Sequence, residues 1–309
     1  MAPVAGFACT PAPADADALI TGPTWQTGDR RELLVTADQQ GTSRIDPGAT
    51  AEVPVTLTVT DADGELVRLL WEADEPSLLD VGGRAPTRFE QNVTEDLFER
   101  LPRDRIEYAI DNLALVVEVD NVEEIRANLF ETAELIRPAF TDDEYDAVIG
   151  LYESLSDDDL IAIVTGRLQA YHLLEGYALT TDDVIEYEDR LANFLGGEPF
   201  PATTTVRIVE MVDADGCVLL EQVSTPDPAE FSRILAESLV EAGLAEPEDI
   251  EEAADAFGSL SIETVARAQF DFESGLLWRF RSVETVSDGI AEETETLTIL
   301  DVTEADPVS

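Results

Sequence analysis

Few residues in this sequence of 309 are of types that do nucleophilic or metal chemistry. The single histidine, His172, follows Ala170-Tyr171 and precedes Leu173-Leu174. One histidine excludes every multi-histidine metal site, and no Gly-x-Ser-x-Gly segment accompanies it. Its apolar neighbours predict a histidine packed at a helix end. The sequence therefore predicts no catalytic, cofactor-binding or metal-binding residue, and no cofactor.

Carboxylates are abundant and form two kinds of local cluster. Asp142-Asp143 and Asp157-Asp158-Asp159 stand where helices are expected to begin, so capping and the helix dipole account for them. Asp61-Ala62-Asp63-Gly64 and Asp213-Ala214-Asp215-Gly216 space aspartates as calcium loops do but lack the further ligands. They predict hairpin turns with glycine in the left-handed region. Acid–base hydrolysis by paired carboxylates is kept as an alternative.

The charge of the chain is strongly negative. Asp and Glu number 67 against 18 basic residues, all of them Arg, which gives a formal net charge of −49. Such a surface repels nucleic acid and anionic membranes, and no run reaches the roughly 18 apolar residues of a transmembrane segment. Because molar salt screens this repulsion, the composition predicts a halophile protein. The alternative is a mesophilic protein with an acidic partner-binding face.

The two cysteines, Cys9 and Cys217, allow at most one disulfide. Cys217 begins an apolar run and is interpreted as a buried thiol. Cys9 follows small residues and precedes Pro11-Ala12-Pro13-Ala14-Asp15, which resembles the end of a lipoprotein signal peptide, although Gly6 replaces the usual leucine. The resemblance implies lipid attachment at Cys9. The alternative is an unstructured leader, and in both cases residues 1–19 lie outside the fold.

Hydrophobic periodicity predicts strands and helices in alternating groups. Helices are expected where the spacing is helical and where capping residues or Asp-Pro mark a start. The expected strands are residues 31–36, 53–60, 66–71, 105–110, 113–119, 184–191, 204–212, 217–223, 261–272, 276–285 and 292–302. The expected helices are residues 89–101, 122–136, 156–174, 228–242 and 247–258, with a further helix that opens at residues 141–144.

Two parts of the chain repeat one order of elements. Residues 28–64 match residues 181–216, and each part is followed by a loop, a helix and another hairpin. We interpret this as an internal duplication of a strand–hairpin–helix–hairpin unit. The predicted class is α+β, with curved antiparallel sheet and helices packed on one face. The units are residues 20–174, with a helical insert, and residues 175–309, with a terminal meander; the alternative is one continuous domain.

Aromatic residues near the C-terminus suggest an apolar face. Phe270 and Phe272 stand two apart, as do Trp278 and Phe280, so each pair is expected on one face of its strand. Left open, that face would be the floor for an apolar ligand. Covered by helices, it would be ordinary core.

The second half resembles a family of uncharacterised bacterial exported proteins, often predicted lipoproteins. The resemblance rests on Gly176-Tyr177, on Gly197-Glu198-Pro199-Phe200-Pro201-Ala202 and on the hairpin through Asp215-Gly216. It implies export and a mixed sheet-and-helix fold, and it supplies no catalytic residue.

These observations together predict a non-enzymatic binding or interaction protein. We expect an envelope or secreted protein of a halophile, membrane-anchored through Cys9, with an apolar ligand between sheet and helices or an envelope protein as its partner. The alternatives are an envelope scaffold without a small-molecule site, a carboxylate hydrolase, and a protein of the cytoplasm of a salt-accumulating halophile.

Overall fold

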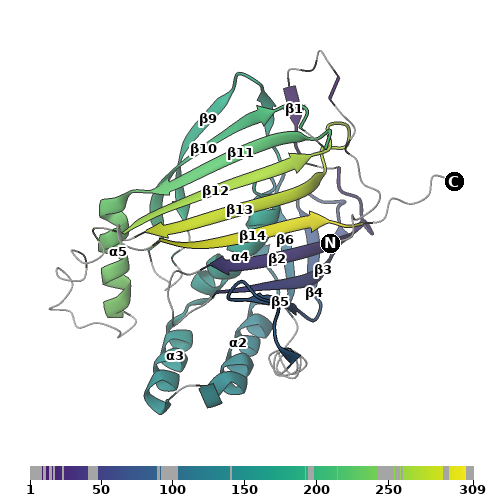
Figure 1. Cartoon of the computed structure of the whole chain (residues 1–309). Coiled ribbons are helices and arrows are strands. Elements are labelled where there is room, and N and C mark those ends of the chain that lie inside the picture. Colours follow the sequence, from purple (N-terminus) through teal and green to yellow (C-terminus); the bar gives the residue numbers. More distant parts are fainter. Residues whose placement is uncertain are drawn as a thin grey trace.

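Antiparallel strands make up most of the fold (Figure 1). The computed structural model describes residues 9, 12–13, 16, 18–22, 24–40, 48–88, 91, 104–139, 141–191, 193, 198–213, 215–241, 254, 258, 260–287 and 292–303. The strands are β1 (Ala18–Ile20), β2 (Arg30–Gln40), β3 (Ala49–Asp61), β4 (Val67–Ala73), β5 (Ser77–Val81), β6 (Arg105–Ile110), β7 (Val116–Val119), β8 (Ala178–Thr180), β9 (Val184–Leu191), β10 (Phe200–Glu210), β11 (Val218–Pro226), β12 (Ser261–Phe270), β13 (Leu277–Ser287) and β14 (Glu292–Asp301).

Twelve of these strands form one sheet, in the order β7-β6-β4-β3-β2-β14-β13-β12-β11-β10-β9, with β5 paired to β3. Each half of the chain contributes an antiparallel meander, and in the first half β5 folds back onto β3, so that β4 pairs with β6. The pairing of β14 with β2 joins the two meanders into one continuous sheet. The α+β class predicted from the sequence is confirmed.

Both meanders contain a hairpin closed by an Asp-x-Asp-Gly turn. Asp61 accepts a hydrogen bond from the backbone of Asp63 at 3.0 Å, and Asp213 accepts one from Asp215 at 2.8 Å. Gly216 has a φ of 83°, as expected, but Gly64 is not among the positive-φ glycines, so the expectation for that turn is wrong. The aspartate hydrogen bond is common to both turns and so does not by itself require a left-handed glycine. In the second turn the backbone N–H of Asp213 also donates to the Cys217 carbonyl at 2.9 Å, which reverses the chain at Gly216. The internal duplication stays a prediction.

Four α-helices lie in the part of the chain that the structure describes. They are α2 (Val122–Ile136), α3 (Asp142–Ser154), α4 (Asp157–His172) and α5 (Pro228–Glu241), with a short 3-10 helix at Arg137–Ala139. Ser156 caps α4 by accepting a hydrogen bond from the backbone of Asp159, and the Asp159 side chain accepts one from the backbone of Ser156. This capping box confirms the interpretation of the acidic cluster. Within the described residues, no helix is long and apolar enough to cross a membrane.

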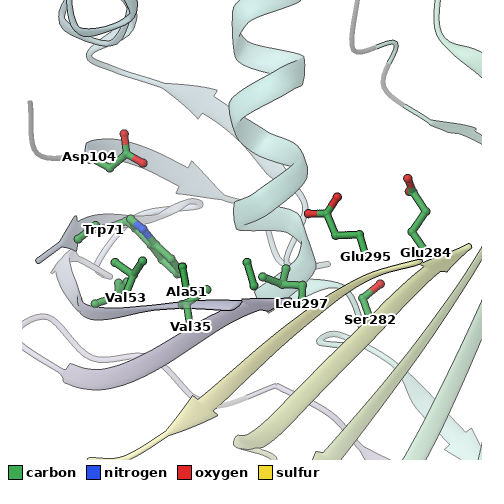
Figure 2. Close-up of a pocket in the computed structure, with 12 residues that line it drawn as sticks. Val35, Ala51, Val53, Trp71, Asp104, Ser282, Glu284, Glu295 and Leu297 are labelled. Carbon is green, nitrogen blue, oxygen red and sulfur yellow. The ribbon is translucent and has the colours of Figure 1, made fainter. Parts of the chain in front are cut away.

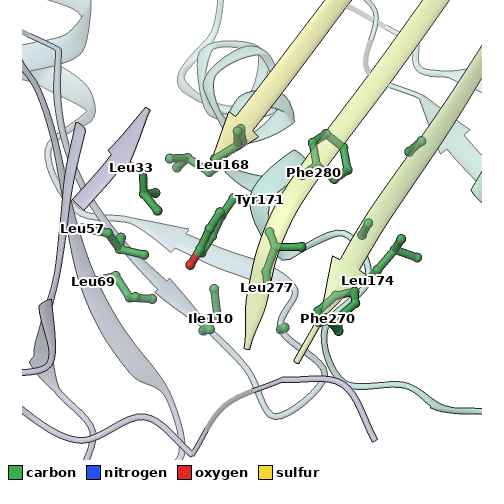
Figure 3. Packing of buried hydrophobic residues seen from close by; sticks show 14 of the residues in the cluster. Leu33, Leu57, Leu69, Ile110, Leu168, Tyr171, Leu174, Phe270, Leu277 and Phe280 are labelled. Atoms are coloured by element: carbon green, nitrogen blue, oxygen red, sulfur yellow. The ribbon is translucent and has the colours of Figure 1, made fainter. Parts of the chain in front are cut away.

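The main core lies between α4 and one face of the sheet. Tyr171 and Leu168 of α4 stand between side chains from the two meanders, and Figure 3 shows Leu33, Leu57 and Leu69 on one side of Tyr171. Leu277, Phe270 and Phe280 lie on the other side. One helix therefore packs against both halves of the sheet.

Helix α5 covers the same face of the sheet near its other edge. Phe231, Ile234 and Leu235 pack on Phe200 of β10. Phe200 shares its strand face with Val206, a member of the main core, because alternate residues of a strand point to one side. The prediction of helices on one face is therefore met by α4 and α5.

Part of the predicted leader belongs to the fold. Leu19 is buried in β1, which pairs with β8, while Cys9 and Ala12 are also buried. The expectation that all of residues 1–19 lie outside the fold is therefore wrong. Apolar contacts and a disulfide hold this segment, and neither has a periodic pattern in the sequence.

Three short strands escaped prediction, namely β1, β5 and β8, because strands of three to five residues carry too little alternation. The helix expected at residues 89–101 and the one expected at residues 247–258 fall almost entirely outside the described residues.

Candidate functional site

A hollow of about 530 Å³ opens on the α4 face of the sheet, beyond the packed core. Apolar side chains from three adjacent strands form most of its lining (Figure 2). These residues are Val35 and Ala37 of β2, Ala51, Val53 and Val55 of β3, and Trp71 and Ala73 of β4, together with Leu297 of β14. Asp104, Ser282, Glu284 and Glu295 complete the lining.

Small side chains explain why the sheet is hollow here. Ala37 lies directly opposite Ala51, and Ala73 lies opposite Val55 on the next strand pair. Three alanines on adjacent strands leave space that larger residues fill elsewhere in the core. The lining residues of each strand are two apart, so all point to one face. The hollow is thus a local thinning of the same apolar layer that packs against α4.

The opposite side of the hollow is acidic. Glu284 of β13 lies directly across from Glu295 of β14, and Figure 2 shows both on the side away from Trp71 and Asp104. Glu284 is an exposed residue, and its partial removal from water and the facing Glu295 carboxylate raise its pKa. A hydrogen bond of 3.4 Å from the Thr264 hydroxyl acts in the other direction. Like charges directly opposite each other destabilise a strand pair, so this arrangement costs stability.

The chemistry available in the hollow is that of an apolar surface with carboxylates at one end. Such a lining can bury a hydrocarbon body and pair with a positive charge. Two facing carboxylates are also what a glycosidase uses, but Ser282 is the one hydroxyl among the twelve lining residues. That lining offers little to orient a sugar.

A second hollow, of about 710 Å³, is lined by residues of β9, β10 and β11 and by the start of α5. Its lining includes Glu188, Asp189 and Arg190 in succession, and Pro201, Ala202 and Thr203 in succession. Consecutive strand residues point to opposite faces, so this hollow wraps around the end of the strands. It lacks the single apolar face of the first hollow.

The single histidine belongs to a buried chain of hydrogen bonds. Its Nε2 lies 2.9 Å from the hydroxyl oxygen of Tyr108, and its Nδ1 lies 3.0 Å from Oε2 of Glu175. Burial, with a smaller effect of Glu175, raises the pKa of Tyr108, so its hydroxyl stays protonated and donates to Nε2. The ring then donates from Nδ1 to the carboxylate.

This chain is buried away from both hollows. Tyr108, His172 and Glu175 are 0%, 1% and 3% exposed, and none of them lines either hollow. The ring of Tyr171 also packs edge-on against the imidazole, with ring centroids 4.9 Å apart. The prediction of a packed histidine at a helix end is confirmed.

The predicted aromatic ligand face is packed core. Phe270 and Phe280 are 0% and 1% exposed and lie in the main cluster, against which Phe272 packs. Leu277, rather than Trp278, pairs with Phe270, because the register of β12 and β13 shifts by one residue there. Trp278 therefore does not share the core face with Phe280, and of the two alternatives, an open floor and a covered core, the structure has the covered core.

Cys9 and Cys217 form a disulfide across 208 residues of sequence. A sulfur in a disulfide cannot also carry a lipid thioether, so lipid attachment at Cys9 is incompatible with this structure. The interpretation of Cys217 as a free thiol is likewise corrected, although its burial is confirmed. No local pattern could reveal the pairing, because the two cysteines meet only in the folded chain.

Carboxylates take part in the hydrogen bonding of both aspartate turns. Their Asp61 and Asp213 carboxylates accept backbone hydrogen bonds from within their own turns. No group of three or more metal-ligating residues occurs among the described residues.

The hollow itself was not predicted from the sequence. Its alanines are weak strand formers and do not mark a binding site in the sequence. Glu284 and Glu295 are two among many acidic residues, so they are not distinctive either. A usable signal was that residues 51, 53 and 55, like residues 35 and 37, are small or apolar at every second position. Which of these residues lie side by side depends on strand register.

Comparison with known proteins identifies no family. No protein-family model matches the chain, and no curated protein matches it. Among solved structures, one described as "Lipid-protein interactions in lipovitellin" aligns with 92% of this chain at 9% identity and a TM-score of 0.41. The chain spans 26% of that protein's length. A likeness at this level identifies neither a family nor a ligand.

Proposed function

We propose that this chain is a non-enzymatic binding protein that holds an apolar ligand in the hollow between β2–β4 and β13–β14. The observation that carries the proposal is the 530 Å³ space lined on one face by eight apolar side chains. A pocket of this size, mostly apolar with a few polar groups at one end, is typical of small-ligand sites. The site differs from the aromatic face expected from the sequence but lies on the same side of the sheet.

The proposal includes a place of action outside the cytoplasm, in a salt-rich environment. The Cys9–Cys217 disulfide supports an oxidising compartment, because cytosolic thiols are kept reduced. The net charge of −49 supports high salt. An envelope role remains part of the proposal, without lipid attachment through the Cys9 sulfur.

A scaffold without a small-molecule site is the second candidate. The observation in its favour is an apolar stripe at the edge of the sheet, where Leu113, Leu115 and Val117 are 56%, 49% and 48% exposed. Exposed apolar stripes mark protein contacts. The two candidates differ in what they predict for the hollow. The binding protein should take up an apolar molecule there, whereas a scaffold does not require such binding.

The test is binding of the neutral apolar fluorophore N-phenyl-1-naphthylamine. We expect saturable fluorescence enhancement with one site per chain. Ala37→Phe together with Ala51→Phe places two rings in the hollow from directly opposed positions and should weaken binding at least tenfold. The matched control is Thr36→Phe with Thr298→Phe, an opposed pair on the other face of the sheet.

The control variant should bind as the unmodified protein does. Absence of saturable binding, or equal loss in both double variants, would overturn the proposal and favour the scaffold. Circular dichroism of both variants establishes that they are folded.

A further inference from the structure

Side chains change from apolar to acidic in steps along the hollow. Three successive rows cross β13, β14, β2 and β3 at directly paired positions. The innermost row is Phe280, Ile299, Val35 and Val53; the next is Ser282, Leu297, Ala37 and Ala51; the outermost is Glu284, Glu295, Gln39 and Ala49. Of β14, Leu297 and Glu295 line the hollow, two strand residues or about 7 Å apart, while Ile299 of the innermost row is part of the packed core below it. A ligand lying along β14 meets hydrocarbon at one end and carboxylates at the other.

The outermost row brings two negative charges directly opposite each other, and no described residue places a positive charge beside them. Neither Glu284 nor Glu295 forms an ion pair with an arginine in the part of the chain that the structure describes. This contrasts with Glu221 on the other face, a carboxylate that Arg207 and Arg267 contact at 2.6 and 2.7 Å. Among the described residues, Glu284 and Glu295 thus lack the arginine partners that Glu221 has.

We propose that the hollow binds a cationic amphiphile, whose hydrocarbon body lies on the apolar rows and whose ammonium group lies between Glu284 and Glu295. This inference rests on the proposed function and adds the charge of the ligand. A single positive charge relieves the repulsion between the facing carboxylates, and the apolar rows contribute the burial of hydrocarbon. A neutral or anionic amphiphile gains only the second contribution.

The pH dependence of binding follows from the groups that face the ammonium site. They are Glu284 and Glu295, with Asp104 on the far side of the hollow and the neutral Thr264 and Gln39 beside them. Since the pKa of Glu284 is raised, this carboxyl takes up a proton at a higher pH than an ordinary glutamate does. The preference for a cation should therefore decline through that pKa.

The experiment compares decyltrimethylammonium, decanol and decanoate as competitors of bound N-phenyl-1-naphthylamine. It is done below micelle concentrations and in 0.5 M NaCl, where long-range attraction to the acidic surface is screened. We expect decyltrimethylammonium to compete at concentrations at least tenfold lower than decanoate, a difference of about 1.4 kcal/mol. In Glu284→Gln with Glu295→Gln this preference should disappear while decanol competes unchanged.

The matched control is Glu52→Gln with Glu263→Gln, which removes the same charge from strand positions outside the hollow. It should keep the cation preference. The stability of the Glu284→Gln variant gives a second readout. Because folding raises the pKa of Glu284, its ionisation opposes folding, so stability falls as the pH rises from the ordinary glutamate range through the raised pKa. The variant should lack that fall and be at least as stable at neutral pH.

The outcomes separate the inference from the proposed function. If the fluorophore binds but the three competitors act alike, or if the control variant loses the preference equally, the cationic ligand is refuted and the apolar site stands. If the fluorophore does not bind at all, the proposed function fails and the inference fails with it.

Discussion

At the scale of single residues, the hydrogen-bonded chain of Tyr108, His172 and Glu175 matters because all three side chains are buried. A histidine in apolar surroundings is tolerated only when both ring nitrogens have partners, and here a hydroxyl and a carboxylate supply them. The chain links β6 to the end of α4 and to the turn that follows. It therefore fixes the helix whose apolar side fills the core.

Tyr108→Phe tests this role. The change removes the hydroxyl that donates to Nε2 of His172 and leaves a buried acceptor unpaired, so the free energy of unfolding should fall by about 1–3 kcal/mol. Tyr177→Phe is the control, because its hydroxyl has only a 3.4 Å contact with the half-buried Tyr187 hydroxyl. That variant should lose about 0.5 kcal/mol or less. Urea unfolding measures both, and equal losses in the two variants would show that the buried chain contributes nothing special.

At the scale of elements, the hydrophobic periodicity of the sequence was enough to predict a helix or strand that buries one face regularly. Strand β9 alternates in burial along its whole length, and α2 has the apolar spacing of a half-buried helix; both were predicted at their observed bounds. The same reasoning failed at Trp278, because a one-residue shift between β12 and β13 reverses the alternation. That shift arises from pairing between strands and has no trace in either strand alone.

The long-range features were beyond sequence reasoning for a related reason. The hollow needs Ala37, Ala51 and Leu297 to share one row, which depends on the register of three strands. The pairing of Cys9 with Cys217 depends on where the first residues of the chain lie in the finished fold. Periodicity reports which face a residue takes, whereas register and chain path decide which residues meet.

The disulfide joins the segment before β1 to the start of β11, and its presence can be counted chemically. Protein purified without reductant and denatured should show no free thiol, whereas a lipid on Cys9 would leave the Cys217 thiol to react. Reduction should lower the free energy of unfolding by about 2–5 kcal/mol, because the bond closes a very long loop. Cys9→Ser with Cys217→Ser serves as the control, and reductant should not affect its stability. One reactive thiol per chain, or no effect of reductant on the natural chain, would contradict the bridge.

At the scale of the whole molecule, arginine is the scarce partner. Arg105 lies within 4.0 Å of Glu72, Glu107 and Glu124, and Arg233 contacts three glutamates at 2.6–3.4 Å. Even so, 67 carboxylates against 18 arginines leave at least 49 negative charges without a matching positive charge. Mutual repulsion of these charges opposes folding in dilute salt.

Salt should therefore raise the Tm of this protein, and most of the rise should occur at low salt concentration. Raising NaCl from 0.05 to 1 M shortens the Debye length to about 3 Å, which screens repulsion between neighbouring exposed carboxylates. A gain of about 3 kcal/mol would raise Tm by about 5 °C in a chain of this size. Thermal unfolding followed by circular dichroism measures the shift, with sucrose as the control, because sucrose strengthens burial without screening charge. Screening acts mainly in the first few hundred millimolar, so the rise should be steepest there in NaCl and absent there in sucrose. A Tm that is flat across the NaCl series would mean that the acidic surface is no burden in dilute solution, and the high-salt origin would lose its physical basis.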